Sequence, residues 1–296
     1  MNTQLVKNSL CGWQRSDLKT YSESWHQLGG SFCTHPEVIS WLSKKQGLQI
    51  TYLKKKTRDG GCSGLYYVNQ SFSVYTDCYP FIFEDILLPL HAEHKPLIPI
   101  RTSRLSPLNE GGVRNSAYFP WAKRKICYVR THFSKNTLRK RKGESNKFLR
   151  AGGQVISISE LSNSQVCEAY IRLFNLRWNN EKRCYSAAAL LEVLAHFRSF
   201  LFGHALIMDG KIIAIDLIFK SASERWIYFD DVNGGYDPQY SQWRPGSVLL
   251  WENICAARHL SDEENKRMIF SLGVYEKEWE YKNLWCDALP LGRILI

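Results

Sequence analysis

The chain lacks the features that mark membrane-spanning and disulfide-stabilised proteins. None of its 296 residues lies in an apolar stretch that approaches about eighteen residues, the length from which a membrane-spanning helix is expected. Residues Met1–Trp13 hold no long apolar run after Lys7, so we expect no signal peptide. The nine cysteines are scattered and include no Cys-x-x-Cys pair. This usage is typical of reduced, mostly buried thiols in a cytosolic protein.

Arrangements typical of metal sites and catalytic triads are scarce as well. His91 and His94 are the nearest approach to a metal-ligand pair, but Pro89 and Pro96 flank them, which favours a loop. Eight scattered histidines form no Ser-His-Asp or Cys-His pattern, and no paired glutamates stand out. We therefore expect no metal cofactor.

Positive charge is concentrated in one window, Trp121–Arg150. Eleven basic residues and a single acid, Glu144, give this window +10 of the +11 carried by the whole chain. The basic residues are Lys123, Arg124, Lys125, Arg130, Lys135, Arg139, Lys140, Arg141, Lys142, Lys147 and Arg150. Such a band on an otherwise nearly neutral chain indicates an anionic partner. Acidic lipid headgroups, tRNA and DNA are the three open alternatives; sequence-specific DNA is the weakest, because no helix-turn-helix or RNP-type pattern is present.

The residues that follow alternate between helical and extended patterns. Ser134 is a suitable N-cap for a helix that ends at Gly152-Gly153, with most basic side chains on one side and Leu138 and Leu149 on the other. Further helices are predicted over 165–178, 187–200 and 248–259, and strands over 154–159, 204–208, 211–220, 225–231 and 268–272, with Asp209-Gly210 as a hairpin turn. This order predicts an α+β fold with an antiparallel sheet flanked by helices.

The length allows two lobes, which we place at residues 1–130 and 131–296. In the first lobe, residues 36–45 are predicted to form a helix started by Thr34, and residues 49–54 and 65–69 to be extended. Residues 78–120 are rich in proline and lack periodicity, so no element is assigned there.

Four stretches of the second part follow a specific order. They are Leu149-Arg-Ala-Gly-Gly153, Met208-Asp-Gly210, Asn233-Gly-Gly-Tyr-Asp-Pro238 leading to Arg244-Pro-Gly-Ser247, and Phe270-Ser-Leu-Gly273 followed by Tyr281-Lys-Asn-Leu-Trp285. Together they resemble the GNAT-like acyltransferase fold, in the branch that holds the Fem peptidyltransferases. The resemblance covers about residues 133–286, and it implies that the first lobe is a second, degenerate GNAT-like unit.

An early stretch adds a narrower resemblance. Gly29-Gly-Ser-Phe-Cys-Thr-His-Pro-Glu-Val-Ile39, with the same C-terminal stretches, is similar to the macrophage-inducible (Mig) virulence proteins of enteric bacteria. This resemblance implies a factor that supports resistance to cationic antimicrobial peptides. It also implies peripheral attachment to the inner face of the cytoplasmic membrane.

Arg244, Gly246 and Ser247 are the candidate cofactor-binding residues. Pro245 at the first helical position, free backbone N–H groups and the Arg244 guanidinium would together form an anion site. The alternative is that Pro-Gly-Ser only starts a buried helix. Acetyl-CoA-dependent GNAT enzymes carry a glycine-rich pyrophosphate loop, whereas Pro245 stands where its first glycine belongs. This departure disfavours acetyl-CoA, and both acyl-CoA and aminoacyl-tRNA stay open as donors.

Lys282, Tyr281 and Asp230 are the candidate catalytic residues. Acyl transfer needs a donor group aimed at the oxyanion that forms on the attacked carbonyl. The resemblance implies Lys282 for that role and Tyr281 as a proton donor. Asp230, with Asp231 beside it at a strand end, is the candidate base for an incoming amine. For each residue the alternative is ordinary packing or pairing at the rim.

The leading hypothesis is a cytosolic, two-lobed protein that binds the inner membrane through its basic band and has a GNAT-like acyltransferase or aminoacyltransferase lobe. The residues expected to meet the anionic partner are Lys123, Arg124, Lys125, Arg139, Lys140, Arg141, Lys142 and Lys147. One alternative is a non-catalytic ligand- or membrane-binding protein of the same fold. The other is a regulator that binds nucleic acid.

Overall fold

The computed structural model describes residues 3–295, and its first part is built on a small antiparallel sheet. The strands β1 (Gln14–Ser16), β2 (Ile50–Lys56) and β3 (Cys62–Val68) pair in that order. The helices here are α1 (Thr3–Leu10), α2 (Leu18–Leu28) and α3 (Pro36–Lys45), and α2 packs against β3. The predicted helix over 36–45 is confirmed, although His35 rather than Thr34 is its N-cap.

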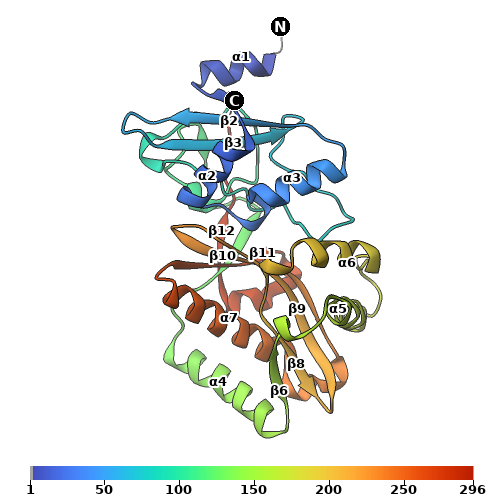
Figure 1. The fold of residues 1–296 in the computed structure, drawn as a ribbon. Coiled ribbons are helices and arrows are strands. Elements are labelled where there is room, and N and C mark those ends of the chain that lie inside the picture. Colours follow the sequence, from blue (N-terminus) through green and yellow to red (C-terminus); the bar gives the residue numbers. More distant parts are fainter. Residues whose placement is uncertain (1–2, 296) are drawn as a thin grey trace.

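The second part is built on a sheet of eight strands (Figure 1). Its order is β12 (Cys286–Pro290), β5 (Lys125–Val129), β11 (Arg267–Val274), β10 (Trp226–Tyr236), β9 (Lys211–Ala222), β8 (His204–Met208) and β6 (Gln154–Ser157), with β7 (Leu201–Phe202) also beside β9. All neighbours pair antiparallel except β10 and β11, which are parallel. The sheet is therefore mixed, whereas an antiparallel sheet was predicted. The difference arises because α7 (Pro245–Glu263) connects β10 to β11 as a crossover, which parallel neighbours require.

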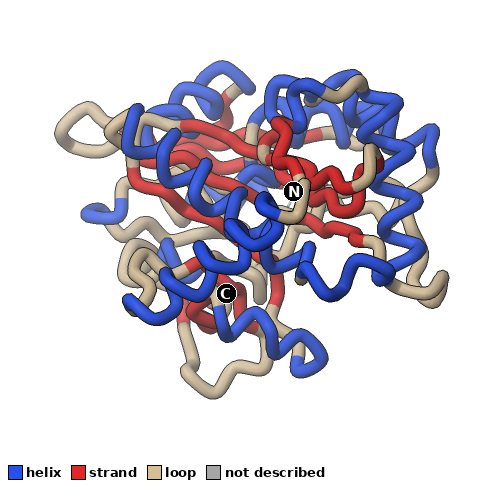
Figure 2. The backbone as a smooth tube through the Cα atoms, turned by 90° about the horizontal axis from the view of Figure 1, so that it is seen from below, coloured by secondary structure: helices blue, strands red, loops and turns tan. Residues whose placement is uncertain are grey.

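Helices cover both faces of this sheet. On one face α5 (Asn163–Arg177) packs on β9 and β10, and α6 (Ala187–His196) packs on α5. On the other face α7 packs on β8 to β11, and α4 (Lys135–Arg150) packs on α7. Figure 2 shows the strands in the middle with helices along both sides. A strand that is covered by helices on both faces has no side turned to water, and this explains the nearly continuous apolar run of β9.

The hairpin and the basic helix have the local chemistry that the sequence predicts. Asp209 and Gly210 take φ values of 51° and 69° between β8 and β9, as a tight two-residue turn requires. Ser134 caps α4 by accepting a hydrogen bond from the Thr137 backbone N–H, and Gly152 has a φ of 91° after its end.

One hydrophobic core joins the early residues to the large sheet. Phe32 stacks on Phe219 of β9 with ring centroids 4.8 Å apart and planes 3° from parallel. Both belong to a cluster of buried side chains that also includes Trp25 of α2 and Tyr170 of α5.

The strand β5 precedes residue 131, the start of the predicted second lobe, but it lies between β11 and β12 in the large sheet. The division into residues 1–130 and 131–296 stays a prediction.

Two further strands, β4 (Ser116–Ala117) and β13 (Arg293–Ile294), form a separate antiparallel pair. Residues 78–120, which were left unassigned, otherwise hold only two short 3-10 turns, Ala92–His94 and Pro107–Asn109.

Candidate functional site

A cavity opens where the parallel strands β10 and β11 diverge. Their pairing runs from Trp226 beside Arg267 to Asp230 beside Ser271 and ends there. Beyond that point β10 has an irregularity between Asp231 and Asn233 and stays with β9, while β11 stays with β5. The cavity measures about 730 Å³ and is lined by both strands, the start of α7, the end of α5, and the segment Lys277–Leu284.

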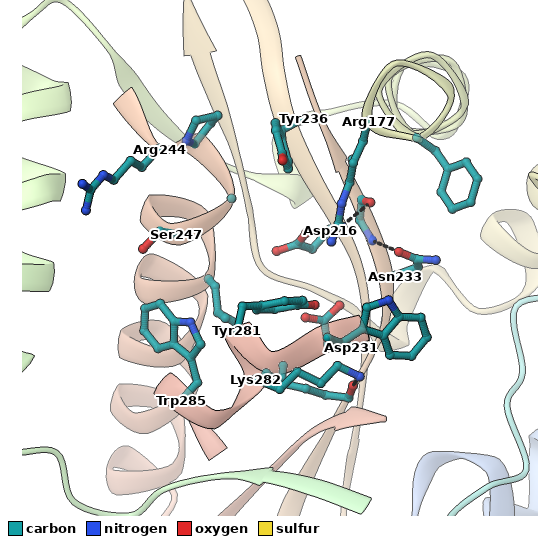
Figure 3. A pocket seen from close by; sticks show the side chains of 18 of the residues that line it. Arg177, Asp216, Asp231, Asn233, Tyr236, Arg244, Ser247, Tyr281, Lys282 and Trp285 are labelled. Atoms are coloured by element: carbon teal, nitrogen blue, oxygen red, sulfur yellow. Dashed lines mark hydrogen bonds between the residues drawn. The ribbon is translucent and has the colours of Figure 1, made fainter. Parts of the chain in front are cut away.

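Two carboxyl groups lie in the wall of this cavity. They belong to Asp216 of β9 and Asp231 of β10 (Figure 3). Burial raises the pKa of Asp216 to about 6. Burial, and then the neighbouring Asp216, raise the pKa of Asp231 well above its ordinary value, while Lys282 and Arg177 act in the opposite direction. A carboxyl pair of this kind holds a proton at a pH where isolated aspartates are ionised.

Lys282 is held in place by the backbone of β11, beyond the point where β11 stops pairing with β10. Its ammonium donates hydrogen bonds to the carbonyl oxygens of Leu272 (2.6 Å) and Val274 (2.8 Å) of β11. It also lies 4.4 Å from the centre of the Trp279 ring. The side chain is only 5% exposed, and this burial lowers the pKa of Lys282. A buried ammonium with a fixed direction is suited to stabilise negative charge that develops nearby.

Tyr281 and Arg177 complete the charged wall. Figure 3 shows Tyr281 pointing toward Asp231. The Arg177 guanidinium donates a hydrogen bond to the Gly234 carbonyl oxygen (2.8 Å). Burial raises the pKa of Tyr281, while Arg177 lowers it. The two acids of the wall are thus matched by the two cations Arg177 and Lys282.

The structure brings Lys282, Tyr281 and Asp231 together but places Asp230 elsewhere. Successive residues of a strand point to opposite faces. The carboxyl of Asp230 lies 3.8 Å from the Cys33 thiol, on the side of the sheet that meets the early residues. Burial, and then the nearby Asp85 carboxyl, raise the pKa of Asp230 to about 7.

The candidate cofactor-binding residues lie at the start of α7, at one side of the cavity. Arg244 takes a left-handed conformation with φ of 51°, and Figure 3 shows its side chain turned away from Tyr281 and Lys282. Its guanidinium donates to Glu144 Oε1 of α4 (2.7 Å). Ser247 donates from its hydroxyl to Glu144 Oε2 (3.2 Å).

The basic band separates into an exposed part and a buried part. On α4 the exposed cations are Lys135, Arg139, Lys140, Lys142, Lys147 and Arg150. Arg141 is only 6% exposed and lies over the Trp285 ring at 4.3 Å. In the loop before β5, Lys123 and Arg124 are exposed, and Lys125 is half-buried. Leu138 and Leu149, which were expected to face inward, are 37% and 45% exposed.

Cations also surround the mouth of the cavity. Beyond Lys282 and Arg141, the basic lining residues are Lys140, Arg177, Lys182, Arg183 and Arg244, whereas Asp216 and Asp231 are its acids. The exposed face of α4 reaches this mouth through Lys140. The cavity therefore presents a cationic entrance and a wall that holds two carboxyls.

Sequence reasoning missed Arg177, Asp216, Glu144 and Trp279. Asp216 had a readable signal, because it interrupts the apolar run of residues 212–219. Arg177 had none, since a basic residue in the last turn of a helix is ordinary. Trp279 comes close to Lys282 only through the folding of the segment Lys277–Leu284.

Membrane-spanning helices and metal clusters are both absent from residues 3–295. No helix in this range is long and apolar enough to cross a membrane. Within the same range, no three His, Cys, Asp or Glu side chains are grouped so that they could hold a metal ion.

Comparison with known proteins places the chain in a family. The C-terminal domain of a putative lysylphosphatidylglycerol synthetase from Agrobacterium fabrum is similar at 14% identity, over 63% of this chain and 69% of that chain, with a TM-score of 0.39. That similarity is too distant to support an argument about function. No match was found among curated protein sequences. A family model described as Mig-14 matches residues 35–294. Because this match spans most of the sequence, the chain belongs to the Mig-14 family.

Proposed function

We propose that the protein is a GNAT-like acyltransferase or aminoacyltransferase that supports resistance to cationic antimicrobial peptides at the inner face of the cytoplasmic membrane. The observation that carries the proposal is the cavity between β10 and β11, where Asp231, Tyr281 and Lys282 converge. Diverging parallel strands give an acyl group room to reach the polar side chains of the wall, which a fully paired sheet would not.

The geometry supports a division of roles among these residues. The nitrogen of an acceptor amine attacks the acyl carbonyl, and its proton passes to the Asp231 carboxylate. Lys282 stabilises the oxyanion that forms, because its ammonium is held by two backbone carbonyls and needs no rearrangement. The bond to the leaving group breaks, and Tyr281 supplies the proton that the leaving atom takes. The proton held by Asp231 then passes to Tyr281, which restores both groups. The base in this scheme is Asp231, since Asp230 lies away from the cavity.

The cationic entrance supports an anionic carrier for the acyl group. Both acyl-CoA and aminoacyl-tRNA carry phosphates, and Lys140, Arg177 and Lys182 lie where such groups would enter. The transfer assay must therefore include both donors.

The exposed face of α4 supports a membrane, rather than nucleic acid, as the anionic partner. Leu138 and Leu149 are exposed eleven positions apart, so they lie on the same side of the helix. Lys142 lies beside them and is also exposed. Leucines beside cations suit the boundary between lipid headgroups and acyl chains, whereas nucleic acid offers nothing for these leucines to enter.

Transfer is tested with purified protein and labelled acyl-CoA and aminoacyl-tRNA donors, using anionic lipid vesicles or cationic peptides as acceptors. We expect Lys282→Ala to lower the transfer rate at least about a hundredfold, as loss of an oxyanion donor does. Lys277→Ala is the matched control, because Lys277 is exposed on the same segment and does not line the cavity. If no donor supports transfer and Lys282→Ala cells keep full peptide resistance, the catalytic proposal is wrong.

Membrane attachment is tested separately by vesicle binding and by tRNA binding, each titrated with salt. Neutral replacements at Arg139, Lys140, Lys142 and Lys147 should abolish binding to anionic vesicles. Arg141 is left in place because it is buried and its loss would disturb the fold. Stronger loss of tRNA binding than of vesicle binding would favour nucleic acid as the partner.

A non-catalytic binding protein is the second candidate function. It is favoured by the contact of Arg244 with Glu144, because this contact engages a candidate donor-binding residue with an internal partner. Retained resistance in Lys282→Ala cells, together with lost resistance after neutralising the exposed face of α4, would support it.

A further inference from the structure

The start of α7 holds a set of donors of the kind that binds phosphate. Two guanidinium groups, from Arg141 and Arg244, and the Ser247 hydroxyl converge there. The helix N-terminus adds the positive end of its dipole, although the backbone N–H groups of Ser247 and Val248 already donate to the Arg244 carbonyl oxygen. Phosphate is recognised by this combination of arginines, hydroxyl and helix terminus.

The carboxylate of Glu144 already occupies this set. Arg141 Nη1 donates to Glu144 Oε2 at 2.8 Å, Arg244 Nη1 donates to Oε1 at 2.7 Å, and the Ser247 hydroxyl donates to Oε2 at 3.2 Å. Arg141 Nη1 also lies 2.7 Å from the Ser247 hydroxyl oxygen. The Glu144 side chain is 13% exposed and that of Arg141 7%. Both carboxylate oxygens are thus engaged inside the protein.

The set keeps one donor that Glu144 does not use, and Glu144 itself is held in its ionised form. The Nε of Arg141 is buried and has no hydrogen-bond partner among residues 3–295. Burial raises the pKa of Glu144, but hydrogen bonds from Arg141 and Arg244 outweigh burial and hold it below its ordinary value. Glu144 is therefore ionised at neutral pH. It is also the single acid of the basic window Trp121–Arg150.

We propose that Glu144 is an internal substitute for a phosphate group and closes the start of α7 to carriers that bind through a pyrophosphate. A pyrophosphate placed there would meet the Glu144 carboxylate at close range, and like charges repel strongly when they are partly desolvated. Displacing Glu144 would leave an ionised group without its three partners. The acyl carrier then enters by the cationic mouth at Lys140 and Lys182, and its phosphates do not sit on α7.

This inference rests on the proposed function only where it concerns an acyl carrier. The closed anion site is a binding property of the protein, measured without any transfer reaction. Failure of the transfer assay and failure of the binding test below are therefore separate results.

The test measures binding of inorganic pyrophosphate by calorimetry to the full-length protein. We expect the wild-type protein not to bind it with a dissociation constant below about 1 mM. Glu144→Ala should bind pyrophosphate at least tenfold more tightly, and adding Arg244→Ala to it should remove the gain. Glu144→Gln, which keeps the shape of the side chain without its charge, should show a smaller gain of the same sign.

Glu252→Ala is the matched control. Glu252 of α7 accepts a hydrogen bond from Ser145, so its removal changes the net charge equally and leaves Arg141 and Arg244 paired. Three results would overturn the inference. They are wild-type binding as tight as that of Glu144→Ala, an equal gain in Glu252→Ala, and folded Glu144 variants that bind no more tightly than wild type. If the Glu144 variants fail to fold, the wild-type protein still tests the inference. Wild-type binding of pyrophosphate that Arg244→Ala removes would place the pyrophosphate at the start of α7 and would contradict the inference. No such binding would support it.

Discussion

Asp230 and Asp231 are consecutive on β10, but Asp231 lines the cavity while Asp230 contacts the Cys33 thiol. The alternation of a strand gives these neighbours opposite surroundings. Asp231 is near Asp216, Arg177 and Lys282, whereas Asp230 is near Asp85. One acid therefore belongs to the candidate site, and the other belongs to the contact between the large sheet and the early residues.

Asp230→Asn should stabilise the protein in a pH-dependent way. The pKa of Asp230 is about 7 in the folded protein against 3.8 ordinarily, so the folded state binds this proton more tightly than the unfolded state. Stability therefore falls as pH rises from about 4 to about 7, and asparagine removes that fall. We expect the Tm gain of the variant to be near zero at pH 4 and at least about 3 °C at pH 8. Asp262→Asn, on an exposed residue of α7, serves as control; a gain that does not change with pH would contradict the prediction.

Asp216→Asn should move the pH dependence of transfer. The rate should rise with pH as the carboxyl pair loses its proton, because Asp231 must be ionised to accept the proton of the amine. The Asp216 carboxyl raises the pKa of Asp231, so its removal should shift the rising limb toward lower pH. The measurement is the rate between pH 4.5 and 8.5. An unmoved limb in the variant would show that the two carboxyls do not act as a pair.

Gly235→Ala should destabilise the protein strongly. A Cβ at Gly235 of β10 would lie 2.3 Å from backbone atoms of Leu173 and Phe174 in α5, which a side-chain rotation cannot relieve. The strand or the helix would have to move, at the wall that holds Asp231 and Arg177. We expect a loss of about 2–4 kcal/mol in the free energy of unfolding, measured in urea.

Gly143→Ala gives the opposite comparison. Gly143 is exposed inside α4, and an added Cβ there would meet nothing within 4 Å. Alanine is the better helix former, so the free energy of unfolding should rise by about 0.5–1 kcal/mol. A loss of stability would mean that α4 needs flexibility at this position.

Phe32→Ala should weaken the contact between the early residues and the sheet. Phe32 is fully buried and stacks on Phe219, so its truncation should lower the free energy of unfolding by about 3–5 kcal/mol. Leu10→Ala, at a residue 79% exposed, should change it by less than about 0.5 kcal/mol. Two separate transitions in wild-type urea unfolding, with only one moved by Phe32→Ala, would support the predicted division into two lobes.

The sequence alone determined the features that depend on nearby residues. The turn at Asp209-Gly210, the cap at Ser134 and the apolar run of β9 follow from local chemistry. Most helices and strands after residue 133 were therefore predicted closely, whereas β7, β12 and β13 were not. The concentration of charge in Trp121–Arg150 needed only counting, and the candidates Lys282 and Tyr281 came from the resemblance of short ordered stretches.

Only the tertiary structure decided which of these residues meet. The parallel pairing of β10 with β11 depends on where α7 crosses the sheet, and the cavity exists because that pairing ends at Asp230 and Ser271. The face on which Asp231 lies depends on strand register, which one residue of slippage would reverse. The lone acid Glu144 could be counted in the sequence, but its position between Arg141 and Arg244 arises from the packing of α4 on α7. Contacts between residues a hundred positions apart carry no local signal, and for that reason the site took its form only in the folded chain.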